Sequence, residues 1–451
     1  TDPAAVLAQR ERLDLERTLF IVSTKSGGTV ETLSFFKYFY NLVAGTVGAE
    51  QAGRHFIAIT DPGSKLVDLS SRFSFRELLL NDPHIGGRFS ALSFFGLLPA
   101  ALLGTDIGEL LERARTSAQL CRQPISPDDA GNPAALLGLT MAELALTGRD
   151  KLTLVLSPAV DSFGDWLEQL IAESTGKQGR GILPVVGEPV GPPPSYGNDR
   201  LFVHLRLGND STGDEPVGKL VAAGHPLVTV NLTGPYDLGA QFFIWEFATA
   251  VAGYRLGINP FDQPDVEAAK VLARRMTASY RETGSLPAVA PALVEGEVEV
   301  FSDIDGSSIG ELINRFLDQA QPGAYVSLQA YLPPTPEVDA ALLALRSGIR
   351  RRTKLATTSG YGPRFLHSTG QLHKGDAGIG LFIQLTAEML TDLPIPDQAG
   401  SETSSISFGI LEASQAMGDA QALKDAGRAV IRFHFRGGPV DGMAELIRAL
   451  E

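Results

Sequence analysis

The chain has 451 residues, of which 44% are hydrophobic and 20% are charged, as in a soluble globular protein. This length exceeds what one hydrophobic core usually holds, so two or three domains are expected. A formal net charge of −14 argues against nucleic acid or an anionic membrane surface as a partner, and no apolar run is long enough to cross a bilayer. Cys121 is the single cysteine and cannot form an internal disulfide, and no secretory signal pattern is visible, so a cytoplasmic protein is expected.

The first part of the chain alternates short apolar runs with longer helical stretches. This alternation is typical of βαβ units around a parallel sheet, and it predicts a first domain over residues 1–148. The chain begins Thr-Asp-Pro and its first clear strand starts near Thr18, so we expect it to be a piece of a longer protein. The expected strands are residues 19–22, 55–60 and 77–80.

The same pattern starts again near Lys151 and predicts a second α/β domain over residues 149–293. A long helix is expected to begin near Asp262 and to lead into a linker at residues 288–293. The remaining residues, 294–451, predict a small α+β domain. The other expected strands are residues 152–157, 201–207, 227–232, 325–332, 380–386 and 429–435.

A polar loop, "STKSGGTVET" (residues 23–32), separates the first predicted strand from the first long helix. A strand that turns sharply into a helix directs unpaired backbone N–H groups and the positive end of the helix dipole at the loop, which favours an anion. One interpretation is therefore a phosphate-binding loop. The other is an ordinary Ser/Thr/Gly turn with Thr29 as N-cap, and the spacing is not that of a Walker A motif.

A second short motif, "IGGRFS" (residues 85–90), precedes a helical run. The paired glycines permit close approach of the backbone to a ligand, and Arg88 offers a planar fork to an oxyanion. Alone, the motif is a weak signal, and a surface turn is its more common explanation.

A third motif, "QLIAESTGK" (residues 169–177), closes a predicted helix. Gln169 and Glu173 are four residues apart and share one helix face, and Gly176 is expected to end the helix. Glu173 then lies in the last turn, where the negative end of the dipole disfavours its charge. A catalytic carboxylate and a solvated helix-end glutamate both fit this pattern.

The fourth motif, "GINPFDQPDVEAAK" (residues 257–270), opens a helix. Asp262 or Gln263 is expected as the cap, with Pro264 in the first turn and Lys270 about two turns along. This composition predicts a well-capped helix and by itself indicates no chemistry.

Taken in order, the four segments resemble phosphoglucose isomerase, whose two sugar-isomerase (SIS) lobes correspond to the first two predicted domains. Four segments in the family's order are far more specific than any one of them. The resemblance implies an α/β fold with two SIS-type doubly wound parallel-sheet lobes, followed here by the C-terminal α+β domain. The segment "YGPRFLHSTGQLHKG" (residues 361–375) resembles the C-terminal extension of the isomerase half of bifunctional transaldolase/phosphoglucose isomerase proteins, and no transaldolase barrel is present.

The resemblance implies that glucose 6-phosphate and fructose 6-phosphate are interconverted through a cis-enediol, without a metal or other cofactor. Glu173 falls on the base that moves a proton between C2 and C1, Arg88 on the group that stabilises the enediol, and Lys270 on a residue that assists ring opening. The family is usually dimeric, so a homodimer is expected beside the sugar-phosphate partners. The substrate-binding residues that the resemblance implies are Thr24, Lys25, Ser26, Thr29, Gly87, Gln169 and Gln263.

Three features depart from the family pattern. No histidine occurs in residues 196–200, where the ring-opening histidine is expected, and His204 is interpreted as a structural strand residue. The first strand of the first lobe is expected to lie outside this chain, and Asp376 stands where another glycine is expected. The alternative function is a catalytically silent SIS protein that binds sugar phosphates, which would need only the phosphate loop.

Overall fold

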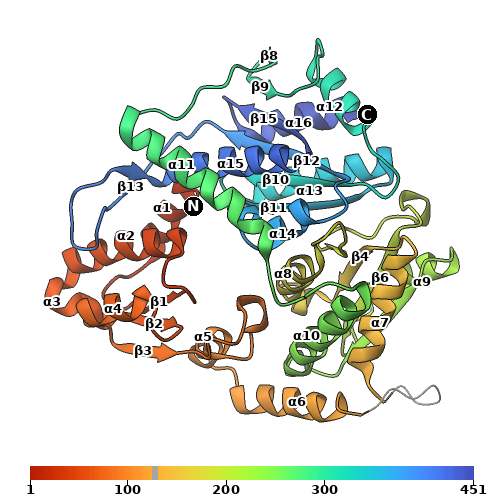
Figure 1. Cartoon of the computed structure of the whole chain (residues 1–451), viewed down its shortest axis with the longest axis horizontal. Helices are drawn as coiled ribbons and strands as arrows, with labels where there is room; N and C mark the ends of the chain where they lie inside the picture. Colours follow the sequence, from red (N-terminus) through yellow and green to blue (C-terminus); the bar gives the residue numbers. More distant parts are fainter. Residues whose placement is uncertain (124–130, 451) are drawn as a thin grey trace. The chain divides into compact units, whose positions relative to one another are not determined.

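A computed structural model describes residues 1–123 and 131–450 (Figure 1). The chain divides into two compact units. Unit 1 contains Thr1–Gly108, Met276–Leu286 and Met389–Ser414. Unit 2 contains Glu109–Arg275, Pro287–Glu388 and Gln415–Glu451.

Unit 1 is built on a parallel sheet of three strands in the order β1-β2-β3. Each crossover between these strands contains a helix, which is what parallel neighbours require. The register pairs Val22 with Ala58 and Ala58 with Leu78, so β2 is the central strand and is buried along its whole length. The elements are α1 (Pro3–Arg12), β1 (Phe20–Ser23), α2 (Val30–Val47), α3 (Ala49–Ala52), β2 (Phe56–Thr60), α4 (Lys65–Arg72), β3 (Glu77–Leu80) and α5 (Phe94–Leu102).

A later segment of the chain returns to unit 1. The short antiparallel pair β13 (Pro394–Ile395) and β14 (Ile406–Ser407) packs against α2. Phe408 stacks on Phe35 with ring centroids 5.5 Å apart, and the Asn41 side chain donates to the Ser401 carbonyl at 2.7 Å. These contacts complete an aromatic core that residues 1–108 supply only in part.

Unit 2 contains a four-stranded parallel sheet in the order β5-β4-β6-β7. The inner strand β4 is buried from Lys151 through Val155, as expected for a parallel strand that is covered on both faces. The elements are α6 (Ile107–Leu120), α7 (Pro133–Leu146), β4 (Lys151–Leu156), α8 (Phe163–Thr175), β5 (Leu183–Val185), β6 (Arg200–Leu207), α9 (Asp214–Ala222), β7 (Leu227–Leu232), α10 (Asp237–Leu256) and α11 (Glu267–Thr283), whose residues from Met276 belong to unit 1.

Unit 2 also contains a six-stranded sheet in the order β11-β10-β12-β15-β9-β8. Its first four strands are parallel, whereas β9 and β8 form an antiparallel edge. This region was predicted to be α+β. Most of it is instead α/β, because helices join the four parallel strands, and only β9 and β8 are antiparallel. The elements are β8 (Leu293–Glu295), β9 (Val298–Phe301), α12 (Ile309–Leu317), β10 (Tyr325–Tyr331), α13 (Pro336–Thr353), β11 (Ala356–Tyr361), α14 (Ser368–Gly375), β12 (Gly380–Ala387), α15 (Phe408–Asp425, of which the residues through Ser414 belong to unit 1), β15 (Ala429–Phe435) and α16 (Pro439–Leu450).

The two sheets of unit 2 share a hydrophobic core. Leu183 and Val185 of β5 belong to the same buried cluster as Tyr325 of β10 and Phe382 of β12. The predicted α/β class with parallel sheets is confirmed. The domain boundaries after residues 148 and 293 stay predictions. Within the described residues, no helix combines the length and the apolarity needed to cross a membrane.

One half-buried glutamate of unit 2, Glu246, predicts a pH-dependent stability. Burial raises the pKa of Glu246 to about 8, and its Oε1 has no hydrogen-bond partner among the described residues. Glu246 lies one turn after Phe242, which packs against Phe163 and Trp166. A folded-state pKa above the ordinary value of 4.5 stabilises the fold below pH 4.5, and this contribution is lost as the pH rises toward 8.

We therefore expect Glu246→Gln to raise the free energy of unfolding at pH 8 by about 1–3 kcal/mol and to leave it unchanged near pH 4.5. Denaturant unfolding at both pH values checks this, with Glu215→Gln as the control because the Glu215 side chain is 80% exposed. Equal effects of Glu246→Gln at the two pH values would contradict the burial argument.

Candidate active site

The predicted phosphate loop lies between β1 and α2 in unit 1, as its sequence indicates. Thr29 stands at the N-cap position of α2, but its hydroxyl makes no capping hydrogen bond there. Instead, Thr29 Oγ1 lies 2.8 Å from Thr24 Oγ1, while the amide of Thr24 donates to the Ile59 carbonyl at 3.1 Å. The Ser26 hydroxyl accepts from the amide of Gly28 at 3.3 Å. The loop is thus held by its own hydroxyls, in front of a helix start that favours an anion.

Gly27 fixes the path of this loop. Its φ of +66° is a backbone conformation that side chains disfavour. A Cβ on Gly27 would also lie 2.6 Å from the amide nitrogen of Leu66 and 2.8 Å from that of Lys65, at the start of α4. Only glycine fits both the conformation and the space.

The phosphate-loop prediction and the family resemblance together imply that Gly27→Ala raises KM for fructose 6-phosphate by about tenfold, because displaced loop atoms would no longer meet a phosphate in the right geometry. Steady-state kinetics on the folded variant check this. Gly63→Ala is the matched control: Gly63 has a φ of +75° in the same unit, and a Cβ there meets nothing within 4 Å. An equal rise in KM for both variants would show that backbone strain, and not the contact with α4, is responsible.

Lys25 is paired with a carboxylate beside the loop. Its Nζ lies 2.8 Å from Asp61 Oδ2, and the Asp61 amide donates to the Lys25 carbonyl at 3.3 Å. A phosphate on this loop would therefore share the Lys25 charge with Asp61. Sequence patterns did not identify Asp61, which lies 36 residues away and reaches Lys25 only because β1 and β2 are neighbours.

The Gly-Gly-Arg motif forms a 3₁₀ turn, Gly87–Phe89, in the same unit. A Cβ on Gly87 would lie 3.9 Å from Cδ of Lys25, so this turn and the phosphate loop are adjacent. Arg88 is 3% exposed, with its guanidinium 5.1 Å from the centroid of the Phe89 ring. Unit 1 thus brings Thr24, Lys25, Ser26, Thr29, Gly87 and Arg88 into one region.

The predicted base lies in unit 2, near the end of α8. Glu173 is half-buried, and Gln169 Nε2 donates to Glu173 Oε2 at 3.2 Å, as their spacing on one helix face predicts. The helix ends at Gly176, whose amide donates to the Ala172 carbonyl at 3.0 Å. The Gln169 amide therefore orients the Glu173 carboxylate.

The fourth motif lies in the same unit. Gln263 is exposed and precedes a 3₁₀ turn, Pro264–Val266, and the α-helix α11 begins only at Glu267. This corrects the predicted helix start near Asp262: Pro264 and the extended backbone of Gln263 delay the helix by about one turn. Lys270 lies half-buried in the first turns of α11.

A buried lysine joins these two motifs. Lys177, which follows Gly176, is 1% exposed. Its Nζ donates to the carbonyl of Asn259 at 2.8 Å and to Oδ1 of Asp262 at 2.9 Å, and it also contacts the carbonyl of Asp262. The segment that carries Gln263 is thereby fastened to the end of the helix that carries Glu173. The sequence motif contains Lys177 but indicates no role for it.

Two of the seven histidines, His204 and His373, are buried in the protein. His204 lies in β6 and is 4% exposed, as its interpretation as a strand residue predicts, and burial lowers its pKa. His373 is 2% exposed, and burial lowers its pKa well below the usual range. In the part of the chain that the structure describes, no three His, Cys, Asp or Glu side chains are placed to hold a metal ion together.

Comparisons with known proteins identify the family. Residues 1–181 match the sequence profile of the family described as phosphoglucose isomerase. A glucose-6-phosphate isomerase of Rubrobacter xylanophilus is 32% identical over 330 residues, which are 62% of this chain and 74% of that protein. The chain belongs to the phosphoglucose isomerase family.

Other relatives agree with membership of the phosphoglucose isomerase family. A probable glucose-6-phosphate isomerase of Methanococcus maripaludis is 29% identical over 60% of this chain and 68% of that protein. One of Symbiobacterium thermophilum is 31% identical over 57% of this chain and 65% of that protein. The chain thus spans about two thirds to three quarters of these three relatives. The predicted likeness to the fused transaldolase form stays a prediction.

A solved structure shares the fold of part of this chain. A hypothetical protein of Thermus thermophilus has a TM-score of 0.53 and is 26% identical, over 61% of this chain and 75% of that chain. Family membership supports a sugar-phosphate isomerase, while the roles of the individual residues above stay predictions.

Proposed function

We propose that this chain is an isomerase that interconverts glucose 6-phosphate and fructose 6-phosphate through a cis-enediol. The observation that carries the proposal is the family membership of a chain that retains Glu173, Arg88, Gln263 and Lys270 together. A protein that only binds sugar phosphates would need the phosphate loop alone.

The phosphate of the substrate is proposed to bind the β1–α2 loop through backbone amides and the hydroxyls of Thr24, Ser26 and Thr29. Because the phosphate is remote from the reacting carbons, this binding supplies position and not bond chemistry. Gly87, Gln169 and Gln263 are proposed to contact the sugar.

Glu173 is proposed to remove the proton from C2 of the open-chain aldose and to return it to C1. The hydroxyl proton of O2 moves to O1 in the same sequence, so that C2 becomes the carbonyl of the ketose. Electrons from the broken C–H bond form the enediol double bond, and Arg88 stabilises the negative charge that develops on the oxygen. The hydrogen bond from Gln169 supports this role because it fixes one oxygen of the carboxylate. These steps move protons only, from C2 to C1 and from O2 to O1, so the proposed mechanism uses no metal.

Ring opening is proposed to rest on Lys270 or on spontaneous mutarotation, because residues 196–200 contain no histidine. We further propose a cytoplasmic location, for which the single buried cysteine is the support. A homodimer is proposed from the family, and the net charge of −14 disfavours nucleic acid as a partner.

The test is conversion of fructose 6-phosphate to glucose 6-phosphate, followed through glucose-6-phosphate dehydrogenase. We expect turnover by the chain alone. If there is none, the assay is repeated with the chain extended at its amino end. An extension could pair with β1, which is an edge strand. It could also fill the apolar cavity of about 230 Å³ beside β1, which is lined by Phe20, Phe35 and Phe39. Binding of fructose 6-phosphate without turnover in both forms would contradict the proposal and support a silent binder.

A further inference from the structure

A buried glutamine of the C-terminal region contacts both catalytic segments of unit 2. Gln371, on α14, is fully buried. Its Nε2 donates to the carbonyl of Gly176 at 2.8 Å and to Oδ2 of Asp265 at 2.5 Å. Its Oε1 accepts from the amide of Asp265 at 2.8 Å. One side-chain amide thus uses both donors and its acceptor on two separate stretches of the chain.

The hydrogen-bond partners of Gln371 lie close in sequence to two predicted site residues, Glu173 and Gln263. Gly176 ends α8 three residues after Glu173, and Asp265 lies two residues after Gln263. Lys177 holds the same segment on the other side of Gln263, at Asn259 and Asp262. The segment is therefore clamped before and after Gln263, and the second clamp is supplied by Gln371.

Helix α14 packs so closely on the end of α8 that two positions, Gly176 and Gly375, have no room for a side chain. A Cβ on Gly176 would lie 2.2 Å from Cα of Leu372, and one on Gly375 would lie 2.4 Å from the Gly176 carbonyl oxygen. The amide of Gly179 also donates to the Gly375 carbonyl at 2.9 Å. Both glycines permit the backbone approach that puts Gln371 within hydrogen-bond distance of its partners.

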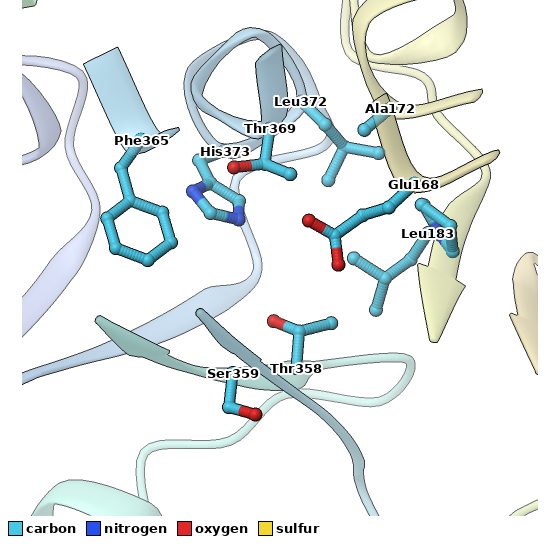
Figure 2. A pocket seen from close by; sticks show the side chains of 10 residues that line it. Glu168, Ala172, Leu183, Thr358, Ser359, Phe365, Thr369, Leu372 and His373 are labelled. Carbon is cyan, nitrogen blue, oxygen red and sulfur yellow. The ribbon is translucent and has the colours of Figure 1, made fainter. Parts of the chain in front are cut away.

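The same packing continues along the two helices (Figure 2). Leu372 of α14 lies beside Ala172 of α8, and the Glu168 side chain extends toward Thr369 and His373. The gap enclosed there has a volume of only about 10 Å³, which is near that of a single water and far too small for a sugar phosphate. The contact between α14 and α8 is therefore a close-packed helix–helix interface and not a ligand pocket.

We propose that Gln371 is a positioning residue for the isomerase reaction, which sets the distance between the Glu173 end of α8 and the Gln263–Lys270 segment. This inference rests on the proposed function. It makes the C-terminal region part of the catalytic apparatus, although none of its residues is proposed to touch the substrate. A displacement of about 1 Å in such a segment is enough to slow catalysis by an order of magnitude or more.

The test is Gln371→Met, which keeps the length of the side chain and removes all three hydrogen bonds. We expect kcat for fructose 6-phosphate to fall about tenfold to thirtyfold and KM to change less than about threefold, because the phosphate loop is untouched. The matched control is Gln384→Met. Gln384 is also a fully buried glutamine, but its Nε2 donates to the Ala416 carbonyl at 3.0 Å and it holds neither catalytic segment.

If Gln371 is merely structural, both variants lose stability and keep kcat, and that result would overturn the proposal. An inactive wild-type chain would instead contradict the proposed function, and the positioning role with it. If Gln371→Met does not fold, a comparison of a single with a double variant tests the positioning role. Gln371→Glu places a carboxylate against both the Asp265 carboxylate and the Gly176 carbonyl oxygen, and adding Asp265→Asn restores a donor at the Asp265 contact alone. Recovery of kcat by about threefold or more in the double variant supports positioning of the Gln263 segment through Asp265, and no recovery overturns it.

Discussion

Glu173→Gln is expected to lower kcat for fructose 6-phosphate isomerisation by at least about a hundredfold, the scale expected when a general base is removed. The substitution keeps the size of the side chain and its place in the last turn of α8, so the fold and the KM are expected to change little. The glutamine amide cannot accept the carbon-bound proton, which is why the loss falls on kcat. The coupled assay, with circular dichroism as a check of the fold, measures this.

A second carboxylate on the same helix provides the control. Glu168 is 7% exposed, and Arg364 Nη1 donates to it at 3.0 Å, while burial raises its pKa. Glu168→Gln is expected to cost stability through the lost ion pair and to keep kcat. A loss in Glu173→Gln that is smaller than about tenfold, or equal to that in Glu168→Gln, would assign the base to another residue.

Arg88→Met is expected to lower kcat by about a hundredfold to a thousandfold, because fixed positive charge beside a developing oxyanion is worth that much when water is excluded. Its 3% exposure means that the variant is also expected to be less stable, so the rate is expressed per folded molecule. Arg88→Lys is expected to recover only part of the rate, because an ammonium lacks the planar fork of the guanidinium.

The chain offers a matched arginine for this comparison. Arg72, in the same unit, lies over the Phe73 ring at 5.2 Å, as Arg88 lies over Phe89 at 5.1 Å, but Arg72 is exposed. Arg72→Met removes a charge and a ring contact of the same kind. Full activity in Arg72→Met together with a loss in Arg88→Met supports the catalytic role, whereas retained activity in both would refute it.

The local features of this protein could be predicted from its sequence. β1, β3 and β15 begin and end within one residue of their predicted bounds. The strands β1 and β3 are short, mainly apolar runs, whereas apolar and polar residues alternate in the second half of β15. The hydrogen bond between Gln169 and Glu173 follows from helix periodicity alone. The position of the phosphate loop between a strand and a helix is likewise a property of neighbouring residues.

Features that depend on distant residues could not be predicted in this way. The strand β11 reads Ala-Thr-Thr-Ser-Gly-Tyr, which is too polar for a strand pattern and pairs with β10 all the same. The return of residues 389–414 to unit 1 leaves no trace in local composition. The partners of Gln371, 106 and 195 residues away, depend on how α14 meets α8, which no spacing rule describes.

The proton transfer itself is the most direct test of the account. Fructose 6-phosphate is incubated with the chain in deuterium oxide, and deuterium at C1 of the ketose and C2 of the aldose is followed by NMR. We predict incorporation by the wild-type chain and a rate at least about a hundredfold lower in Glu173→Gln, because the base that exchanges its proton with solvent is absent. Deuterium incorporation by Glu173→Gln at the wild-type rate would contradict the role of Glu173 as the base.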